Sequence, residues 1–233
     1  MKDASAAPML CLPVRQEIIA GLCFLPFYFL LLPAAVSAAL VLLGIPELYL
    51  ANLIFYILAA GIAALLFRRL LHKSLQALYR PAVLIRTVLL SLVLNYAAAW
   101  AVQLLALLLD PDYANANNAV LLDTYAGHIP ALVLTACVLA PLLEECLFRG
   151  LIFGGLRRYG RVPAYFAAVL IFSAVHIVSY LSVLSPLQVL LSFLQYAPPA
   201  FLLCRCYERT DSLFGSMLLH ALINTISLLA LTL

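Results

Sequence analysis

Residues 129–156 read IPALVLTACVLAPLLEECLFRGLIFGGL. The stretch is long enough to cross a membrane, because a hydrocarbon core of about 30 Å requires about 20 apolar residues in a helix. It also contains Glu144, Glu145 and Arg149, although an ionised side chain at the bilayer centre costs at least about 2.5 to 3.5 kcal/mol on insertion scales. These charges in an apolar span predict a membrane protein with a polar centre inside the bilayer.

The rest of the chain has the same apolar character. Of its 233 residues 67% are hydrophobic and only 10% are charged, and the mean hydropathy is +1.12. A soluble fold cannot bury that much apolar surface. We therefore predict an all-α, polytopic transmembrane bundle of about seven spans, near residues 18–43, 48–67, 82–109, 129–156, 162–181, 187–204 and 213–233.

The basic residues predict the orientation of the bundle. With a cytosolic N-terminus, every Lys and Arg except Arg149 falls on the inner side, while the outer loops carry only acidic charges. The C-terminus then faces outward, in the cell membrane, and the net charge of +3 requires no nucleic-acid partner. Residues 68–80 fit either a short amphipathic helix on the inner surface or a plain loop, and residues 110–128 are expected to form an external loop.

The two adjacent acids differ in whether their own helix supplies an ion-pair partner. Glu145 and Arg149 are four residues apart and lie on one helical face, so they can neutralise each other. Glu144 points about 100° away from Glu145. It must find a partner on another helix or stay protonated.

Two later spans offer such partners at the same depth. One carries Phe172-x-x-x-His176 and the other His220-x-x-x-Asn224, and each pair shares a helical face. At about 1.5 Å per residue, Glu144, His176 and Asn224 all lie roughly 18 to 20 Å from the inner ends of their helices, with His220 one turn shallower. We expect these four side chains to line one cavity near mid-membrane that opens to the cytosolic side.

The three motifs, in this order on successive apolar spans, resemble the signature of the CPBP family. This family comprises CAAX proteases and bacteriocin-processing (Abi) enzymes and is related to the Rce-type prenyl protease. The resemblance covers about residues 129–233, so we expect a catalytic core there, preceded by N-terminal helices and an external loop over residues 1–128 within one structural domain. The motif positions are Glu144, Glu145, Arg149, Phe172, His176, His220 and Asn224.

The resemblance implies an intramembrane endopeptidase of the glutamic type, acting on a membrane protein or peptide without a cofactor. Glu144 would activate a water as general base, and His176 would orient that water. His220 and Asn224 would stabilise the oxyanion, while Glu145, Arg149 and Phe172 would support the site. This chemistry is sound, because amide and imidazole N–H groups are suitable donors to a tetrahedral intermediate.

Three other functions remain open from the sequence. Glu144, His176 and His220 could hold a catalytic zinc, although no H-E-x-x-H motif is present. Intramembrane Glu and His also form proton relays in transporters, although no inverted repeat is visible. The chain could also be a catalytically idle immunity or scaffold protein.

Overall fold

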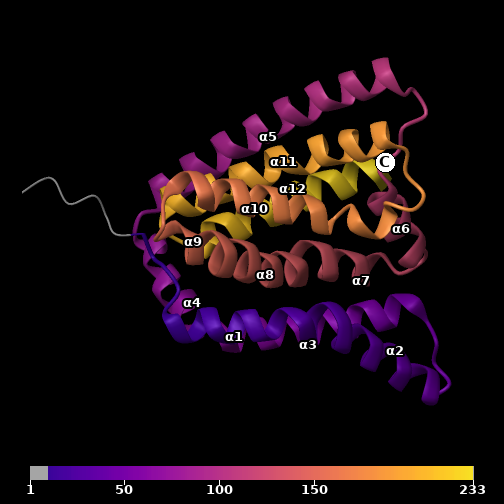
Figure 1. Cartoon of the computed structure of the whole chain (residues 1–233), viewed down its shortest axis with the longest axis horizontal. Coiled ribbons are helices and arrows are strands. Elements are labelled where there is room, and N and C mark those ends of the chain that lie inside the picture. Colours follow the sequence, from indigo (N-terminus) through magenta and orange to yellow (C-terminus); the bar gives the residue numbers. More distant parts are fainter. Residues whose placement is uncertain (1–9, 233) are drawn as a thin grey trace, which may run out of the picture.

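The chain folds into a bundle of long helices that lie alongside one another (Figure 1). This computed structural model describes residues 10–232, so Lys2 and Leu233 from the predictions above lie outside the described residues. The described residues form helices and turns and no strand. Within residues 10–232, seven helical segments are long and apolar enough to span a membrane: Arg15–Leu42, Leu48–Leu66, Pro81–Leu109, Ile129–Arg157, Arg161–Tyr180, Pro186–Thr210 and Leu213–Leu231. The predicted all-α, seven-span fold is confirmed, whereas the cytosolic N-terminus stays a prediction.

Two of the spans contain π-helical turns. The first combines α1 (Arg15–Pro26), the π-helical η1 (Phe27–Leu31) and α2 (Leu32–Leu42). The fourth runs through α7 (Ile129–Leu134), η3 (Thr135–Leu139), α8 (Ala140–Glu144), η4 (Glu145–Gly154) and α9 (Gly155–Arg157), of which η3 and η4 are π-helical. The others are α3 (Leu48–Leu66), α5 (Pro81–Leu109), α10 (Arg161–Val175) continued by η5 (Val178–Tyr180), α11 (Pro186–Thr210) and α12 (Leu213–Thr232).

The fourth span is the centre of the bundle. Its most apolar window is 61% buried, against 17% for α3 and α5, so its charged residues face protein rather than lipid. Small side chains allow the neighbours to approach closely, as is usual between membrane helices. Ala59, Ala60 and Ala63 of α3 are completely or almost completely buried where α3 packs on α8.

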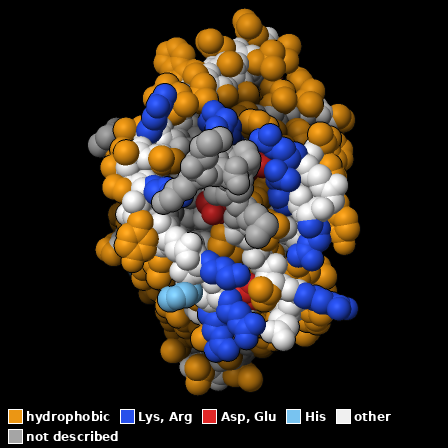
Figure 2. Space-filling view, turned by 90° about the vertical axis from the view of Figure 1, so that its left-hand side faces the viewer, with side chains coloured by type: hydrophobic (Ala, Val, Ile, Leu, Met, Phe, Trp, Pro, Cys, Tyr) orange, Lys and Arg blue, Asp and Glu red, His pale blue; other side chains and the backbone are white. Residues whose placement is uncertain are grey.

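The two ends of the bundle differ in charge and in structure. Figure 2 faces the end that carries α4 (Arg68–Ser74), where Lys and Arg side chains are spread over the surface. There α4 and the short 3-10 helix η2 (Leu75–Tyr79) form the helical alternative predicted for residues 68–80. At the opposite end, the segment predicted as an external loop contains the helix α6 (Ala116–Thr124), and its external position stays a prediction. Asn115 caps α6 by accepting a hydrogen bond from the Asn118 N–H.

Candidate active site

The two adjacent acids lie where the fourth span changes from α8 to η4. Glu144 ends α8, and Glu145 begins the π-helical turns of η4. Glu145 and Arg149 are fully buried residues, and Glu144 as a whole residue retains an exposure of only 9%. π-Helical turns are uncommon and are often found at functional sites.

Glu145 and Arg149 form the predicted ion pair, at 3.0 Å. The Arg149 guanidinium also donates to the Ala200 carbonyl of α11 at 3.4 Å and lies over the Phe172 ring, 4.5 Å from its centroid. The ring of Phe172 thus supports a buried cation from one side through a cation–π contact. The charge of Arg149 is therefore compensated within the bundle by groups from three different spans.

His220 joins the two acids, which the sequence did not predict. Its Nδ1 lies 2.8 Å from Glu145 Oε1, and its Nε2 lies 3.9 Å from Glu144 Oε2. Glu145 is ion-paired with Arg149 and so can only accept hydrogen bonds, which means that His220 Nδ1 carries a hydrogen. Glu145 therefore does more than neutralise Arg149, because it also fixes the His220 ring.

His176 is the C-cap residue of α10, and its ring is fixed by the last turn of that helix. Nδ1 lies 2.8 Å from the Phe172 carbonyl oxygen, which can only accept, so Nδ1–H is the donor. In the neutral imidazole Nε2 then has a free lone pair, and it faces Glu144 Oε2 at 3.8 Å. Phe172 therefore positions His176 through its carbonyl as well as Arg149 through its ring.

The hydrogen bond of the Asn224 side chain is explained by a proline in the fourth span. In η3 the Ala140 N–H bonds to the Thr135 carbonyl, a five-residue register that would next pair residue 141 with Ala136. Residue 141 is proline, which has no N–H to donate. The Asn224 amide donates to the Ala136 carbonyl instead, at 2.7 Å. One of its two amide hydrogens is thus engaged in structure.

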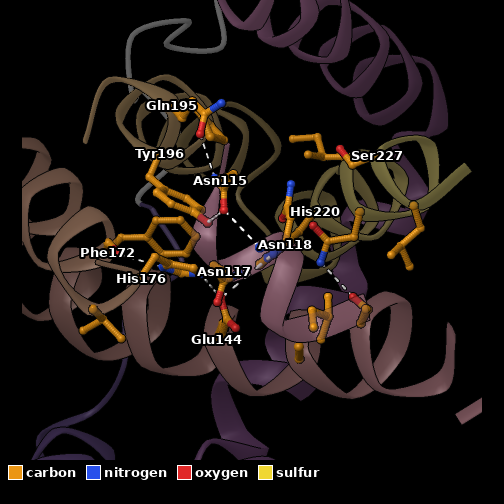
Figure 3. A pocket seen from close by; sticks show the side chains of 18 of the residues that line it. Asn115, Asn117, Asn118, Glu144, Phe172, His176, Gln195, Tyr196, His220 and Ser227 are labelled. Atoms are coloured by element: carbon orange, nitrogen blue, oxygen red, sulfur yellow. Dashed lines mark hydrogen bonds and ion pairs between the residues drawn. The ribbon is translucent and has the colours of Figure 1, made fainter. Parts of the chain in front are cut away.

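The four predicted site residues line one cavity, of about 470 Å³. Figure 3 shows Glu144, His176 and His220 directed toward a shared space from three different helices. Glu144 Oε2 is buried and accepts no hydrogen bond from the described residues. The sequence-based expectation that one cavity joins Glu144, His176, His220 and Asn224 agrees with this geometry.

The cavity opens at the end of the bundle opposite to the Lys- and Arg-rich end. Toward the Lys- and Arg-rich end its lining stops at Phe148, Leu203 and His220, which are all buried. Toward the α6 end the lining includes exposed side chains, among them Val120 and Leu231. The lining therefore gives no support to an opening at the basic end, because apolar packing around η4 closes that end; which end faces the cytosol stays a prediction.

The sequence analysis missed the contribution of α6 to the cavity. Asn115, Asn117 and Asn118 point into it, as Figure 3 shows. Asn115 donates to Gln195 Oε1 at 2.7 Å and accepts from the Tyr196 hydroxyl at 3.2 Å, so α6 is tied to α11. The asparagines of the stretch YANANN, residues 113–118, were the available signal, although a polar stretch of this kind is also typical of a solvated loop.

Fold and site together define a multi-pass membrane protein with a charged centre inside its bundle. Residues 126–226 match the family model described as Type II CAAX prenyl endopeptidase Rce1-like, a segment that holds all three motifs. The resemblance to the CPBP family is thereby confirmed over this segment, which is similar to the CAAX proteases. This is a protease family, and the match supports peptidase activity in a membrane. No curated protein and no solved structure matches the chain.

Proposed function

We propose that this protein is an intramembrane endopeptidase of the glutamic type, in which Glu144 and His176 activate a water molecule. The observation that carries the proposal is the meeting of Glu144 Oε2 with His176 Nε2 at 3.8 Å. Both atoms are hydrogen-bond acceptors in this geometry, and one water can donate a hydrogen to each of them across that distance. Glu144 then takes the proton as the oxygen attacks a substrate carbonyl.

His220 is suited to stabilise the oxyanion when it is doubly protonated. Its Nδ1–H is used by Glu145, so Nε2 becomes a donor only in the imidazolium form. That cation is compensated locally, because two carboxylates, Glu144 and Glu145, then face two cations, Arg149 and His220. A preformed cation directed into the cavity is a strong stabiliser of developing negative charge.

Asn224 supplies the second donor to the oxyanion. One hydrogen of its amide is engaged by Ala136, which fixes the orientation of the group, and the other is free to point into the cavity. A donor held by a structural bond needs little reorganisation when charge develops.

The lining of the cavity supports a polypeptide as substrate. Beyond Glu144 and the two histidines, its polar groups are uncharged amides and hydroxyls, and among the described residues no Lys or Arg lines it. Amide side chains have both donors and acceptors, as a peptide backbone does. The substrate we propose is a segment of a membrane-associated protein or peptide that reaches Glu144 past α6.

The topology and division of the chain belong to the same proposal. We place the N-terminus in the cytosol and residues 129–233 as the catalytic core, in the cell membrane. Residues 1–128 are not a separate module in this proposal, because Tyr56 of α3, Asn95 of α5 and Asn115 beside α6 line the same cavity.

Membrane-peptide proteomics would test the proposal directly. Cells that produce the wild type are compared with cells that produce Glu144→Gln, and with cells that produce Glu47→Gln as a control at an exposed carboxylate. We expect new peptide termini with the wild type and Glu47→Gln and none with Glu144→Gln. Identical termini in all three would favour the transporter or the idle scaffold.

A zinc-dependent protease is the second candidate: one observation favours it, although among residues 10–232 no group of three His, Cys, Asp or Glu side chains is arranged to hold a metal ion. Both histidine Nε2 atoms face the same oxygen of Glu144, and in each ring a hydrogen bond to Nδ1 fixes the orientation, as in many zinc sites. Purified protein treated with a strong chelator and shown to be free of zinc by elemental analysis separates the two. Retained cleavage supports the metal-free mechanism, whereas loss that zinc alone restores makes these residues ligands.

A further inference from the structure

A second polar site lies on the outside of the bundle, near its Lys- and Arg-rich end. A groove of about 380 Å³ runs between α5 and α11, two helices that pack along each other. Its lining shares no residue with the cavity around Glu144, and it consists of Val83, Arg86, Thr87, Leu90, Arg205 and Arg209. Three cations therefore surround a groove that has no acidic residue in its lining.

The three arginines differ from the other basic residues at this end. Arg157 and Arg161 both pair with Glu208, at 2.8 and 2.6 Å. Arg86, Arg205 and Arg209 form no ion pair with any carboxylate of residues 10–232. Arg205 and Arg209 are four residues apart on one helical face, a spacing at which like charges repel. The groove thus concentrates positive charge that the described chain does not neutralise.

The helix dipoles account for only part of this arrangement. Arg209 lies in the last turn of α11, where a cation is favoured by the negative end of the dipole. The dipole gives no such support to Arg86, which is five residues from the start of α5 and so beyond the first turn. Neither the dipoles nor a carboxylate of residues 10–232 balances the three facing arginines, and an anion from outside the chain would do so.

The depth of the groove identifies the source of that anion. Arg86 is five residues from the start of α5 and Arg205 is five residues from the end of α11, which places both about 8 Å inside the helix ends. If α5, whose 29 residues are about 44 Å long, is centred on a hydrocarbon core of about 30 Å, this depth is the level of the lipid headgroups. Val83 and Leu90, which are exposed beside the arginines, offer apolar contact for the upper part of an acyl chain.

We propose that this groove binds the phosphate of an anionic membrane lipid. The guanidinium groups of Arg86, Arg205 and Arg209 hold the headgroup phosphate through charge-assisted hydrogen bonds, and the acyl chains lie along α5. Basic pockets between membrane helices are known to select anionic headgroups in this way. The site is independent of the proposed peptidase chemistry and requires only that the bundle spans a membrane.

Native mass spectrometry of the purified full chain in zwitterionic detergent would test the site. Dioleoyl phosphatidylglycerol and dioleoyl phosphatidylcholine are titrated separately onto the wild type, the triple variant Arg86→Gln/Arg205→Gln/Arg209→Gln and Arg68→Gln. Arg68 is the matched control, because it is an exposed arginine at the same end but outside the groove. We expect preferential binding of phosphatidylglycerol to the wild type and to Arg68→Gln, and a loss of that preference in the triple variant.

The expected loss of phosphatidylglycerol affinity can be given for each arginine. Each arginine removed from the groove should weaken phosphatidylglycerol binding about fivefold. If the triple variant does not fold, Arg209→Gln alone should show this smaller loss. Equal weakening by Arg68→Gln would indicate diffuse attraction to the whole basic end, and equal binding of the two lipids would indicate an apolar groove. Displacement of the lipid by an equal concentration of inorganic phosphate would indicate a free-anion site, and each of these three results would overturn the proposal.

Discussion

Two parts of the cavity wall are stabilised by different kinds of interaction. At the centre, Glu145 contacts Arg149 at 3.0 Å and His220 at 2.8 Å, and all three side chains are buried. At the cover, which we define as α6 with Asn115, neutral hydrogen bonds to Gln195 and Tyr196 are only partly buried. Breaking a buried ion pair is costly, whereas neutral bonds near water can be exchanged for water at little net cost. The centre is therefore expected to be rigid and the cover to be able to open.

Within the centre, the contacts also distinguish the residues that hold the structure together from the residue proposed to react. Every charged group there has a close partner except Glu144, whose Oε2 stands 3.8 and 3.9 Å from the two histidines. The residue proposed to react is thus the one that contributes least to holding the site together. This difference determines the order of the expected effects below.

Glu144→Gln should give the largest loss of activity. The change removes the proposed base but keeps the shape of the side chain, so cleavage should fall by about 10²- to 10⁴-fold or become undetectable. Because Glu144 Oε2 accepts no hydrogen bond within the described chain, thermal unfolding followed by circular dichroism should change little. Cleavage at the wild-type rate by this variant would rule out Glu144 as the base.

Glu145→Gln should instead produce the largest loss of stability. It leaves Arg149 buried without its countercharge, which typically costs about 3 to 5 kcal/mol. It should also slow cleavage, because the carboxylate that holds the His220 ring is replaced by an amide. Thermal unfolding is the measurement, and Arg161→Gln, at an exposed pair with Glu208, is the control that should shift the midpoint little. A stable but inactive Glu145→Gln beside an active Glu144→Gln would reverse our assignment of the two acids.

The centre was predictable from the sequence and the cover was not, for a physical reason. A charge in an apolar span is costly, so Glu144 and Arg149 stand out without any knowledge of the fold. Helical spacing and depth were then sufficient to bring His176 and His220 to the same layer. The bond between His220 and Glu145 depends on how α12 meets η4, and the π-helical turns of η3 alter the register that simple helical counting assumes. Asn115 is neutral and costs little in a loop, so nothing in its sequence context required a buried partner.

Asn224→Ala is expected to slow cleavage by about 10²- to 10³-fold, the usual loss for one oxyanion donor. It should also destabilise the bundle by about 1 to 3 kcal/mol, because the Ala136 carbonyl loses its donor. A second substitution separates these effects. Pro141→Ala supplies a backbone N–H for that carbonyl, so the double variant should regain stability in thermal unfolding while its cleavage remains slow. Recovery of the rate in the double variant would mean that Asn224 serves structure alone.

The smallest effect concerns the cover. Asn115→Ala removes the N-cap of α6 and its bonds to Gln195 and Tyr196, at a typical cost of about 1 kcal/mol for the cap. Asn118→Ala is the matched control, because the same amide is removed from α6 while its backbone N–H still bonds to Asn115. Amide hydrogen exchange should then become faster in α6 of Asn115→Ala and remain slow in η4, since the centre shares none of these bonds. If the cover limits entry, Asn115→Ala should cleave a peptide substrate as fast as the wild type or severalfold faster. Faster exchange in η4 together with α6 would show that cover and centre open as one unit, and the contrast between them would fail.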